Sequence, residues 1–600
     1  MSAGGARPAE TRADALLARN RRWIILGIIL LSVAIRVAYF VELPDSPYNG
    51  SARFANTDMQ FFDHWGREIA AGDWLGARPL HPLHNWHRQV ASIYFREHGM
   101  PDPIYPEATR DLWGGWYGGT RFHQEPLYPY SIAATYRLFG ANPRVVYLWQ
   151  MLLGVLSNLL IYFITRRSFS ESVAVVAAVM AIGCGPLLFY ETLLLRSASI
   201  TFLGLLTVYV SQSALDRESK GGYLLAGLCA GLATLLKSTL ALLGLGALAL
   251  VIWRERKRPR VALARAALLA AGITACLLPV ALRNAAVDAP IFSLSSVAAV
   301  TFYSANFDGA DSGQGFQLSL DEAAEILGRT GGRTVPTLLA TLRTHPHPGS
   351  WLALCARKLG AAWHGYEIPN NVNYYVGLGT SRVLRLLPVS FAWIGSLALA
   401  GMLTAAWTRR NAPMLYLLVL AHLLPLLIFY VLSRFRAPLL AALIPFAAAA
   451  LVWLVEWLLD RRWRPAAVLG AVVLLTTLWT ASPRGPQAGP QIRVADLHMV
   501  LDSWLQTGFS RAHEADDAEQ GVRRIDAALR LEPPSIELLL RGRRSVEPYD
   551  ESYLRLFAHL HMGAALAHRA AGHEEEAARL QTRGLELQRL VEEIDAEGSP

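Results

Sequence analysis

Eleven apolar segments follow one another along the first 480 residues of the chain. A helix of about 20 such residues, rising about 1.5 Å per residue, crosses the hydrocarbon core of a membrane. The segments are 23–41, 143–163, 172–190, 197–215, 222–236, 238–253, 262–282, 383–407, 413–432, 437–459 and 466–481. With 53% of its residues hydrophobic and only 17% charged, the chain is too apolar for a water-soluble protein of this length. The sequence predicts an all-α polytopic membrane protein with about eleven transmembrane helices.

Arginine and lysine clusters mark every second end of these segments. They comprise Arg19, Arg21 and Arg22, Arg166 and Arg167, residues 216–220, residues 254–260, Arg409 and Arg410, and residues 460–464. Basic loops are retained in the cytoplasm, so residues 1–22 are expected to be a cytoplasmic tail and the first segment an uncleaved anchor. The formal charge of +9 then reflects topology, and we expect no nucleic-acid partner. The expected location is the inner or plasma membrane.

The same pattern predicts how the chain is divided. A transmembrane domain spans 23–481 and carries two large outer loops, 42–142 and 283–382. The Pro/Gly-rich stretch 482–495 reads as a linker. Residues 496–600 twice show small and apolar residues at helical spacing around a turn, which resembles tetratricopeptide repeats. We expect a small helical domain on the outer side that could recruit a protein partner; a plain helical cap is the alternative.

Metal and disulfide chemistry have little support in the sequence. No CxxC pair occurs among the four cysteines, which are Cys184, Cys229, Cys276 and Cys355. The histidines of HPLHNWH (81–87) have a spacing that could bind a metal, but Pro82 argues against a helix through His81, and a polar surface loop is the favoured interpretation. We therefore expect no metal site and no required cofactor, and leave a divalent-cation requirement open.

Two carboxylates, Asp58 and Asp63, lie just after the first apolar segment. A helix that starts near Asp58 would direct Phe61, Phe62 and other apolar residues to one face, which favours a helix at the membrane surface. A carboxylate at such a position is commonly a helix cap. Taken alone, the stretch does not distinguish a cap from a catalytic group.

Five stretches occur in order along residues 20–480. They are 58–72, HQEPLYPYSIAATYRLFG (123–140), GLATLLKS (231–238), Arg283-Asn284 and SRFRAPLLAALIPFAA (433–448). Together they resemble the membrane glycosyltransferases of GT-C type that use polyprenyl-phosphate sugars, the superfamily of protein O-mannosyltransferases and lipid A aminoarabinose transferases. In that superfamily a catalytic aspartate opens the first outer loop. The chain differs at Met59, where many members have a second acidic residue.

The resemblance implies an inverting glycosyltransferase with its active site facing outside. It implies Asp58 as general base, with Asp63 as the second candidate. The cations that could bind the donor phosphate are Arg36, Lys237, Arg283, Arg434 and Arg436. For Lys237, Arg434 and Arg436, simple snorkelling to lipid headgroups is the alternative interpretation.

Polar and aromatic residues of the outer loops are candidates for sugar or acceptor contacts. They are Glu125, Tyr128, Asn306, Asp308, Glu367 and Asn371. For the stretches 302–316 and 363–375, which hold the last four, ordinary Gly/Asn loops are the alternative interpretation. The expected partners are a lipid-linked sugar donor and a glycan, lipid or protein acceptor. The alternative from another class is a non-enzymatic polytopic protein, either a transporter of lipid-linked sugars or an envelope assembly scaffold.

Overall fold

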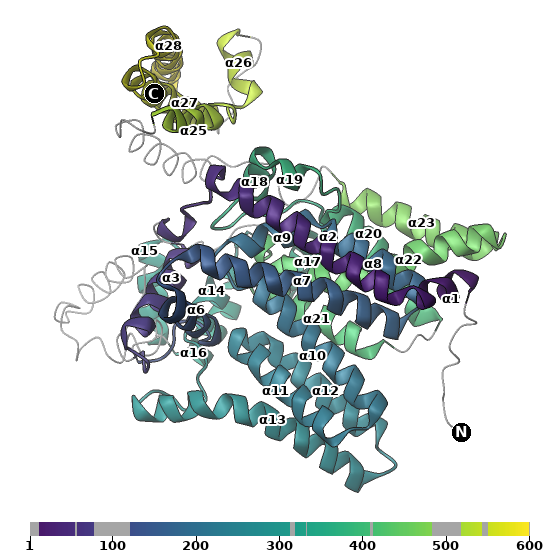
Figure 1. The fold of residues 1–600 in the computed structure, drawn as a ribbon. Coiled ribbons are helices and arrows are strands. Elements are labelled where there is room, and N and C mark those ends of the chain that lie inside the picture. The colour runs from purple at the N-terminus through teal and green to yellow at the C-terminus, as the bar shows by residue number, and fades with distance from the viewer. Residues whose placement is uncertain are drawn as a thin grey trace. The chain divides into compact units, whose positions relative to one another are not determined.

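The computed structural model describes residues 11–54, 57–76, 120–311, 318–331, 333–408, 412–482, 518–542 and 550–598. Every regular element in these ranges is a helix, and no strand occurs in them (Figure 1). The predicted all-α fold is confirmed. Contacts divide the chain into a first unit of Met1–Phe40, Ala55–Asn370 and Val383–Ala488, and a second unit of Val41–Phe54, Asn371–Arg382 and Gly489–Pro600.

Each of the eleven apolar segments contains a helix. Six are long and apolar enough to cross a membrane: α2 (Arg21–Glu42), α7 (Pro143–Ser168), α10 (Ser197–Arg217), α13 (Pro259–Ala286), α22 (Ser433–Leu459) and α23 (Trp463–Thr480). Five are shorter: α8 (Glu171–Ile182), α11 (Lys220–Leu236), α12 (Ala241–Arg254), α20 (Phe391–Trp407) and α21 (Pro413–Ile428). These helices make the chain a membrane protein, while the number of crossings stays a prediction.

The remaining helices that the structure describes between residues 11 and 482 are short or amphipathic. In the first part of the chain they are α1 (Arg12–Arg19), α3 (Asp58–Ala71), α6 (Leu127–Phe139) and α9 (Gly185–Phe189). The second loop region holds α14 (Ala298–Asn306), α15 (Leu320–Thr330), α16 (Thr334–Thr344), α17 (Pro348–Trp363), α18 (Tyr374–Thr380) and α19 (Arg382–Arg385). The 3-10 turns are η1 (Leu43–Asp45), η2 (Ser51–Arg53), η3 (Tyr190–Thr192) and η4 (Ser238–Leu240).

One of the predicted segments is interrupted. The segment 172–190 is α8 followed by α9, because Gly183 ends the first helix and Pro186 can only start the second. A second break lies between the predicted segments 222–236 and 238–253, where Lys237 has an extended backbone with φ −153° and ψ 115°. The extended residue ends α11 and presents its side chain at a helix break.

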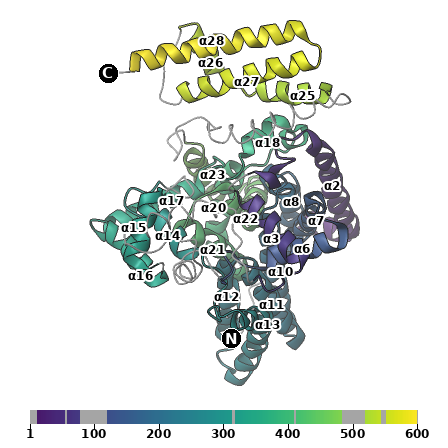
Figure 2. The same ribbon diagram turned by 90° about the vertical axis from the view of Figure 1, so that its left-hand side faces the viewer.

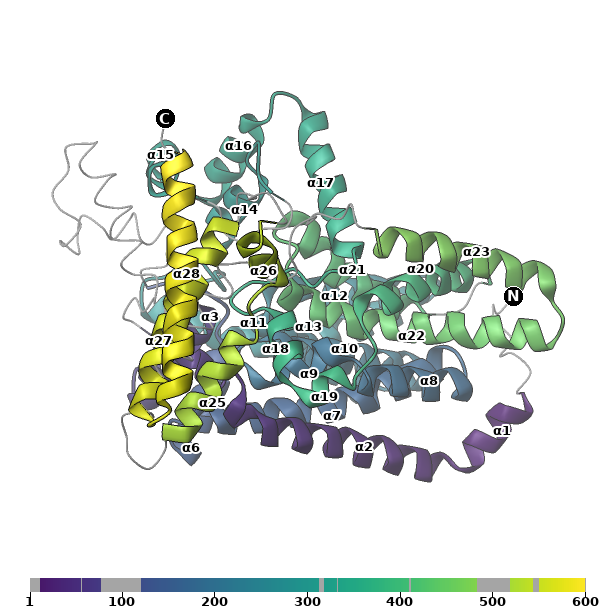
Figure 3. The ribbon, with the colours of Figure 1, turned by 90° about the horizontal axis from the view of Figure 1, so that it is seen from above.

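Close backbone approach holds the apolar helices of the first unit together. A Cβ on Gly227 of α11 would lie 2.0 Å from the carbonyl oxygen of Leu269 in α13. A Cβ on Gly401 of α20 would lie 2.0 Å from the carbonyl oxygen of Phe446 in α22. Small residues of this kind permit tight packing between membrane helices. Figure 3 shows α20, α22 and α23 running alongside one another.

The basic turns of the first unit are joined by ion pairs. The pairs are Arg21 with Glu171 at 2.8 Å, Arg167 with Asp216 at 2.7 Å, and Arg265 with Glu218 at 2.5 Å and with Glu255 at 2.7 Å. These contacts bring the start of α2, the end of α7, the α10–α11 turn and the α12–α13 turn together at one end of the bundle. Several of the basic turns therefore lie at the same end of the bundle, which is the arrangement that the positive-inside pattern predicts.

Reporter fusions test this topology. We expect an outside signal for fusions within 42–140, 283–380 and 490–600, and an inside signal near residues 168, 218, 257, 410 and 462. The reason is the retention of basic loops in the cytoplasm. Paired alkaline phosphatase and fluorescent protein fusions measure it, and a cytoplasmic signal from the tail would contradict both the topology and the side on which the candidate site lies.

The tail helices of the second unit are α25 (Ala518–Leu529), α26 (Pro534–Leu540), α27 (Asp550–Ala570) and α28 (Glu574–Gly598). Figure 2 shows α27 and α28 lying side by side, and Gly572 makes the turn between them with φ 83°. A small core of Ile525, Ala564, Ala565, Ala567 and Leu580 joins α25 to this pair. The helical character of the tail agrees with the sequence, and the tetratricopeptide assignment stays a prediction.

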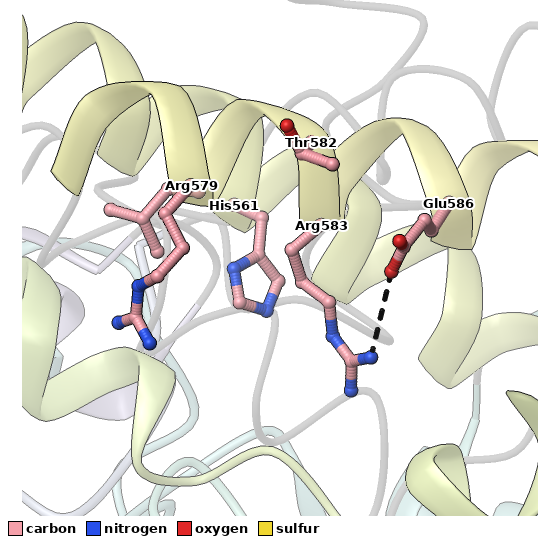
Figure 4. Close-up of a pocket in the computed structure, with 6 residues that line it drawn as sticks. His561, Arg579, Thr582, Arg583 and Glu586 are labelled. Carbon is pink, nitrogen blue, oxygen red and sulfur yellow. Dashed lines mark ion pairs between the residues drawn. The ribbon is translucent and has the colours of Figure 1, made fainter. Parts of the chain in front are cut away.

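Histidine–carboxylate contacts run along one side of the tail helices. The contacts are His573 with Glu519 at 3.1 Å, His568 with Asp526 at 2.9 Å, and His561 with Glu532 at 2.6 Å. Arg583 of α28 also contacts Glu532, at 2.9 Å. A pocket in Figure 4 is lined by these α27 and α28 side chains, with His561, Arg579, Arg583 and Glu586 among them.

The pKa of Glu532 predicts an acid-sensitive tail. Burial raises this pKa, but the contacts with His561 and Arg583 outweigh it and leave the pKa below its ordinary value of 4.5. A carboxylate with a lowered folded-state pKa stabilises the fold above the ordinary value and loses that contribution as the pH falls through the folded-state pKa. We therefore expect hydrogen exchange of α25 and α26 in the full chain, corrected for intrinsic rates, to accelerate below about pH 4.5.

Glu532→Gln should remove most of this acid response and lower the protection already at pH 7. Glu575→Gln, at an exposed position of α28, is the matched control. An unchanged acid response in Glu532→Gln would contradict the assignment.

Candidate active site

Asp58 is the first residue of α3, and its side chain faces two other segments of the first unit. The N-cap is Thr57, whose hydroxyl accepts from the Gln60 amide, so the capping role falls to the threonine. The Asp58 Oδ1 accepts a 2.7 Å hydrogen bond from the Gln124 side chain, and Oδ2 pairs with Arg434. The Asp58 side chain therefore contacts Gln124 and Arg434, and Thr57 caps the helix in its place.

Packing of α3 fixes where Asp58 lies. Phe61, Phe62, Trp65 and Ile69 are all buried. They pack within the protein, where α3 contacts α6, and do not form the membrane-facing surface that the sequence suggested. The apolar face holds α3 in place from behind, so its first residue is presented at a defined position.

Glu125 is the second carboxylate of the site. Its Oε2 accepts from Arg196 at 2.5 Å, and its Oε1 accepts from the backbone amide and the hydroxyl of Ser238 at 2.8 and 2.7 Å. Burial raises the pKa of Glu125, but Arg196 and the Ser238 donors outweigh it and lower the pKa. Glu125 is therefore an ionised group that ties the start of α10 to the break after α11.

Lys237 and Arg434 lie on the ring of one phenylalanine. The Lys237 Nζ and the Arg434 guanidinium carbon are each 4.5 Å from the ring centroid of Phe435. Burial and the nearby Arg196 lower the pKa of Lys237 to about 7. Within the described ranges no carboxylate lies within 4.0 Å of the Lys237 ammonium. This ammonium can therefore accept an anionic ligand.

The contacts join residues that are far apart in sequence into one cluster, which we call the Asp58 cluster. Its members are Asp58, Gln124, Glu125, Arg196, Lys237, Ser238, Arg434 and Phe435. They lie at the start of α3, just before α6, at the start of α10, after the end of α11 and at the start of α22. These ends of α10, α11 and α22 are opposite to the basic turns. When Lys237 is protonated, three cations and two carboxylates give the cluster one surplus positive charge, as an anion-binding site needs.

Two other predicted phosphate ligands, Arg36 and Arg436, form ion pairs with buried carboxylates. Arg36 makes a buried, bidentate pair with Glu191, at 2.8 and 2.6 Å. Arg436 is buried, donates to the carbonyls of His364 and Tyr366, and lies 2.9 Å from Glu367. Because these contacts already occupy both guanidinium groups, neither arginine is assigned to the proposed donor site.

Arg283 holds the two ends of one chain segment. Its guanidinium donates to the carbonyls of Leu75 and Gly76 at 2.6 and 2.7 Å and to the carbonyl of Thr120 at 2.7 Å. It also lies 3.9 Å from the ring centroid of Phe122. Arg283 therefore fixes the chain on both sides of residues 77–119, which lie outside the described residues together with His81 and its neighbours.

Asp63 and Tyr128 belong to the packing of α3 and α6. Asp63 accepts from the Tyr136 hydroxyl at 2.5 Å and from Arg67 at 2.7 Å. Tyr128 is fully buried and donates to the Gln150 side chain at 2.8 Å. Among the described residues, neither side chain has a hydrogen bond or an ion pair with a member of the Asp58 cluster.

The remaining predicted substrate contacts fall in several places. Asn306 is buried and accepts from Lys358 Nζ at 2.8 Å, while Asp308 is exposed and donates its backbone amide to Thr344. Glu367 lies with Arg436, as given above. Asn371 belongs to the second unit and has a left-handed backbone with φ 62°. Of the six predicted substrate contacts, only Glu125 lies in the cluster as described.

Arg196 and Gln124 were not predicted as site residues. Arg196 is a lone cation between two apolar segments at their outer ends, which is the same signal that indicated Lys237. Gln124 immediately precedes Glu125, and no feature of its own distinguished it. Among the described residues no group of three or more metal-ligating side chains occurs.

The fold and the Asp58 cluster define a polytopic membrane protein with a carboxylate-and-cation site at one set of helix ends. Residues 123–283, less than half of the chain, match the family model of the dolichyl-phosphate-mannose-protein mannosyltransferases. The matched segment contains Glu125, Arg196 and Lys237. Over these residues the match confirms the resemblance that was expected from the sequence.

Comparison with other known proteins gives more distant likenesses. No curated protein matches the chain. The archaeal oligosaccharyltransferase AglB from Archaeoglobus fulgidus, in complex with an inhibitory peptide and a dolichol-phosphate, is 14% identical with a TM-score of 0.38 over 88% of this chain. The apo form of the Archaeoglobus fulgidus oligosaccharyltransferase is 15% identical with a TM-score of 0.40 over 88% of this chain. The chain spans 60% of the length of each of these structures.

Proposed function

We propose that the protein transfers a sugar from a polyprenyl-phosphate donor to an acceptor hydroxyl, at the periplasmic or extracellular face of the plasma membrane. The observation that carries the proposal is the Asp58 cluster, in which a carboxylate lies beside cations that exceed the carboxylates by one. The family match over residues 123–283 supports the donor class.

The proposed step is a single displacement. The acceptor oxygen forms a bond to the anomeric carbon, and the bond from that carbon to the phosphate oxygen breaks with its electron pair leaving on the phosphate. The acceptor proton passes to the Asp58 carboxylate, which acts as general base. The products are the glycosylated acceptor, polyprenyl phosphate and a protonated Asp58. Attack from the far face inverts the anomeric configuration.

The other members of the cluster have distinct roles in this step. Lys237 and Arg434 stabilise the charge that develops on the leaving phosphate, because ammonium and guanidinium groups bind phosphate oxygens strongly. Gln124 orients the Asp58 carboxylate through its 2.7 Å hydrogen bond. Glu125 holds Arg196 and the Ser238 backbone, so it fixes the helix break that presents Lys237.

The proposal includes no cofactor, and the tail would recruit a protein partner on the outer side. The test uses the purified full chain in nanodiscs with synthetic polyprenyl-phosphate sugars, and detects release of polyprenyl phosphate and labelling of an acceptor extract. A deletion strain compared with its parent identifies the acceptor by its missing glycan. Sugar flipping without transfer, or no effect on any glycan, would instead support the non-enzymatic alternatives.

A further inference from the structure

The Asp58 carboxylate is engaged on both of its oxygens. Gln124 donates to Oδ1 at 2.7 Å, and Arg434 pairs with Oδ2. Hydrogen bonds from a cation and an amide stabilise the ionised form of a carboxylate, and such a carboxylate takes up a proton less readily. A general base held in this way is a weak base for an acceptor hydroxyl.

Arg434 also faces the anion site. Its guanidinium shares the Phe435 ring with Lys237, and its Nε is buried without a hydrogen-bond partner among the described residues. A buried unsatisfied donor is costly, so this N–H favours any acceptor that reaches it. A phosphate between Lys237 and Arg434 would supply acceptor oxygens to both cations.

The backbone at Arg434 is fixed while its side chain is long. The Ser197 hydroxyl donates to the Arg434 carbonyl at 2.8 Å, and the Tyr190 hydroxyl donates to the neighbouring Ser433 hydroxyl at 2.8 Å. The Ser433 amide donates to the Ile368 carbonyl at 2.8 Å. Because the backbone is tied on several sides, a change of partner requires only a rotation of the guanidinium.

We propose that Arg434 alternates between Asp58 and the donor phosphate, so that Asp58 is restrained while the donor site is empty and becomes an effective base once the phosphate binds. This inference rests on the proposed function and adds a regulation to it. The proton and charge balance over a cycle is complete: Asp58 gains the acceptor proton, the leaving phosphate retains Arg434, and departure of polyprenyl phosphate with loss of the proton restores the pair. The arrangement protects the donor from attack by water before it is fully bound.

The test is binding of a synthetic polyprenyl phosphate without sugar, which cannot react, to the full chain in nanodiscs. Asp58→Asn should bind this lipid about tenfold more tightly than the wild type, because Arg434 no longer has to leave a carboxylate. Arg434→Gln should bind it more weakly. In the Arg434→Gln background, Asp58→Asn should give no further gain. Asp58→Ala provides a second variant with the same expected gain, and Asp63→Asn is the matched control with unchanged binding.

The possible outcomes separate the inference from the function on which it rests. Tighter binding in Asp58→Asn that disappears without Arg434 supports the alternation. Equal or weaker binding in both Asp58 variants, or a gain that persists in Arg434→Gln, overturns it even if the wild type transfers sugar. Failure of every variant, the wild type included, to bind the lipid phosphate overturns the donor site and the inference together.

Discussion

Asp58→Asn should abolish sugar transfer while the protein stays folded and membrane-inserted. The amide keeps the size of the side chain and its contact with Gln124 but cannot accept a proton at neutral pH. General-base assistance is worth about 10²- to 10⁴-fold, so the rate should fall by at least that order. The measurement is turnover in nanodiscs with saturating donor and acceptor, alongside the elution profile of the purified variant.

Asp63→Asn is the control for this variant, since it makes the same chemical change one helical turn away. Asp63 contacts Tyr136 and Arg67 and not the cluster, so its replacement should affect packing of α3 on α6 more than turnover. A loss of transfer confined to Asp63→Asn would make Asp63 the base. Near-normal transfer in both variants would show that the proposed mechanism is wrong.

Lys237→Met should lower the efficiency of donor use by about 10²-fold, the effect typical of removing one group that stabilises developing oxyanion charge. The pKa of Lys237, lowered to about 7 by burial and Arg196, adds a pH signature. Because the ammonium binds phosphate only when protonated, donor use by the wild type should decline as the pH rises through about 7. Donor titrations between pH 6 and pH 9 measure both effects.

Lys237→Arg should retain the charge over this range and flatten the pH dependence. Lys220→Met, an exposed lysine at the opposite helix ends, should behave as the wild type. If Lys237→Met keeps both the donor affinity and the turnover of the wild type, Lys237 has no role at the donor site and its cation serves only to reach lipid headgroups.

Helix positions were predictable because the signal is local. A run of apolar residues predicts a helix wherever it lies in the bundle, and each of the eleven segments contains one. The segment 172–190 was predicted as a single helix because its apolar run is long. Gly183 and Pro186 are the local residues that interrupt it. The extended conformation of Lys237 has no comparable local cause and depends on Glu125, which accepts from the next residue.

The roles of the cations could not be separated from sequence. Arg36, Arg283, Arg434 and Arg436 were all predicted at the outer ends of apolar segments, and nothing in the neighbouring sequence indicates the partner of each. Their partners come from segments far along the chain, such as Glu191 for Arg36. Electrostatic pairing is decided by these partners, so only tertiary structure distinguishes an arginine with a buried carboxylate from one beside an open anion site. Arg196 was missed for the same reason.

The hydrogen bonds of Arg283 on both sides of residues 77–119 have a consequence for how the sequence of this protein can change in evolution. The Arg283 guanidinium binds the carbonyls of Leu75 and Gly76 before residues 77–119 and the carbonyl of Thr120 after them. Arg283 is not a member of the Asp58 cluster, so different residues anchor this segment and the cluster. Doubling the length of a closed loop costs only about 0.6 kcal/mol in entropy. Arg283 and not the Asp58 cluster therefore holds the two ends of this segment, so sequence exchanges between the two anchor points are compatible with an unchanged cluster.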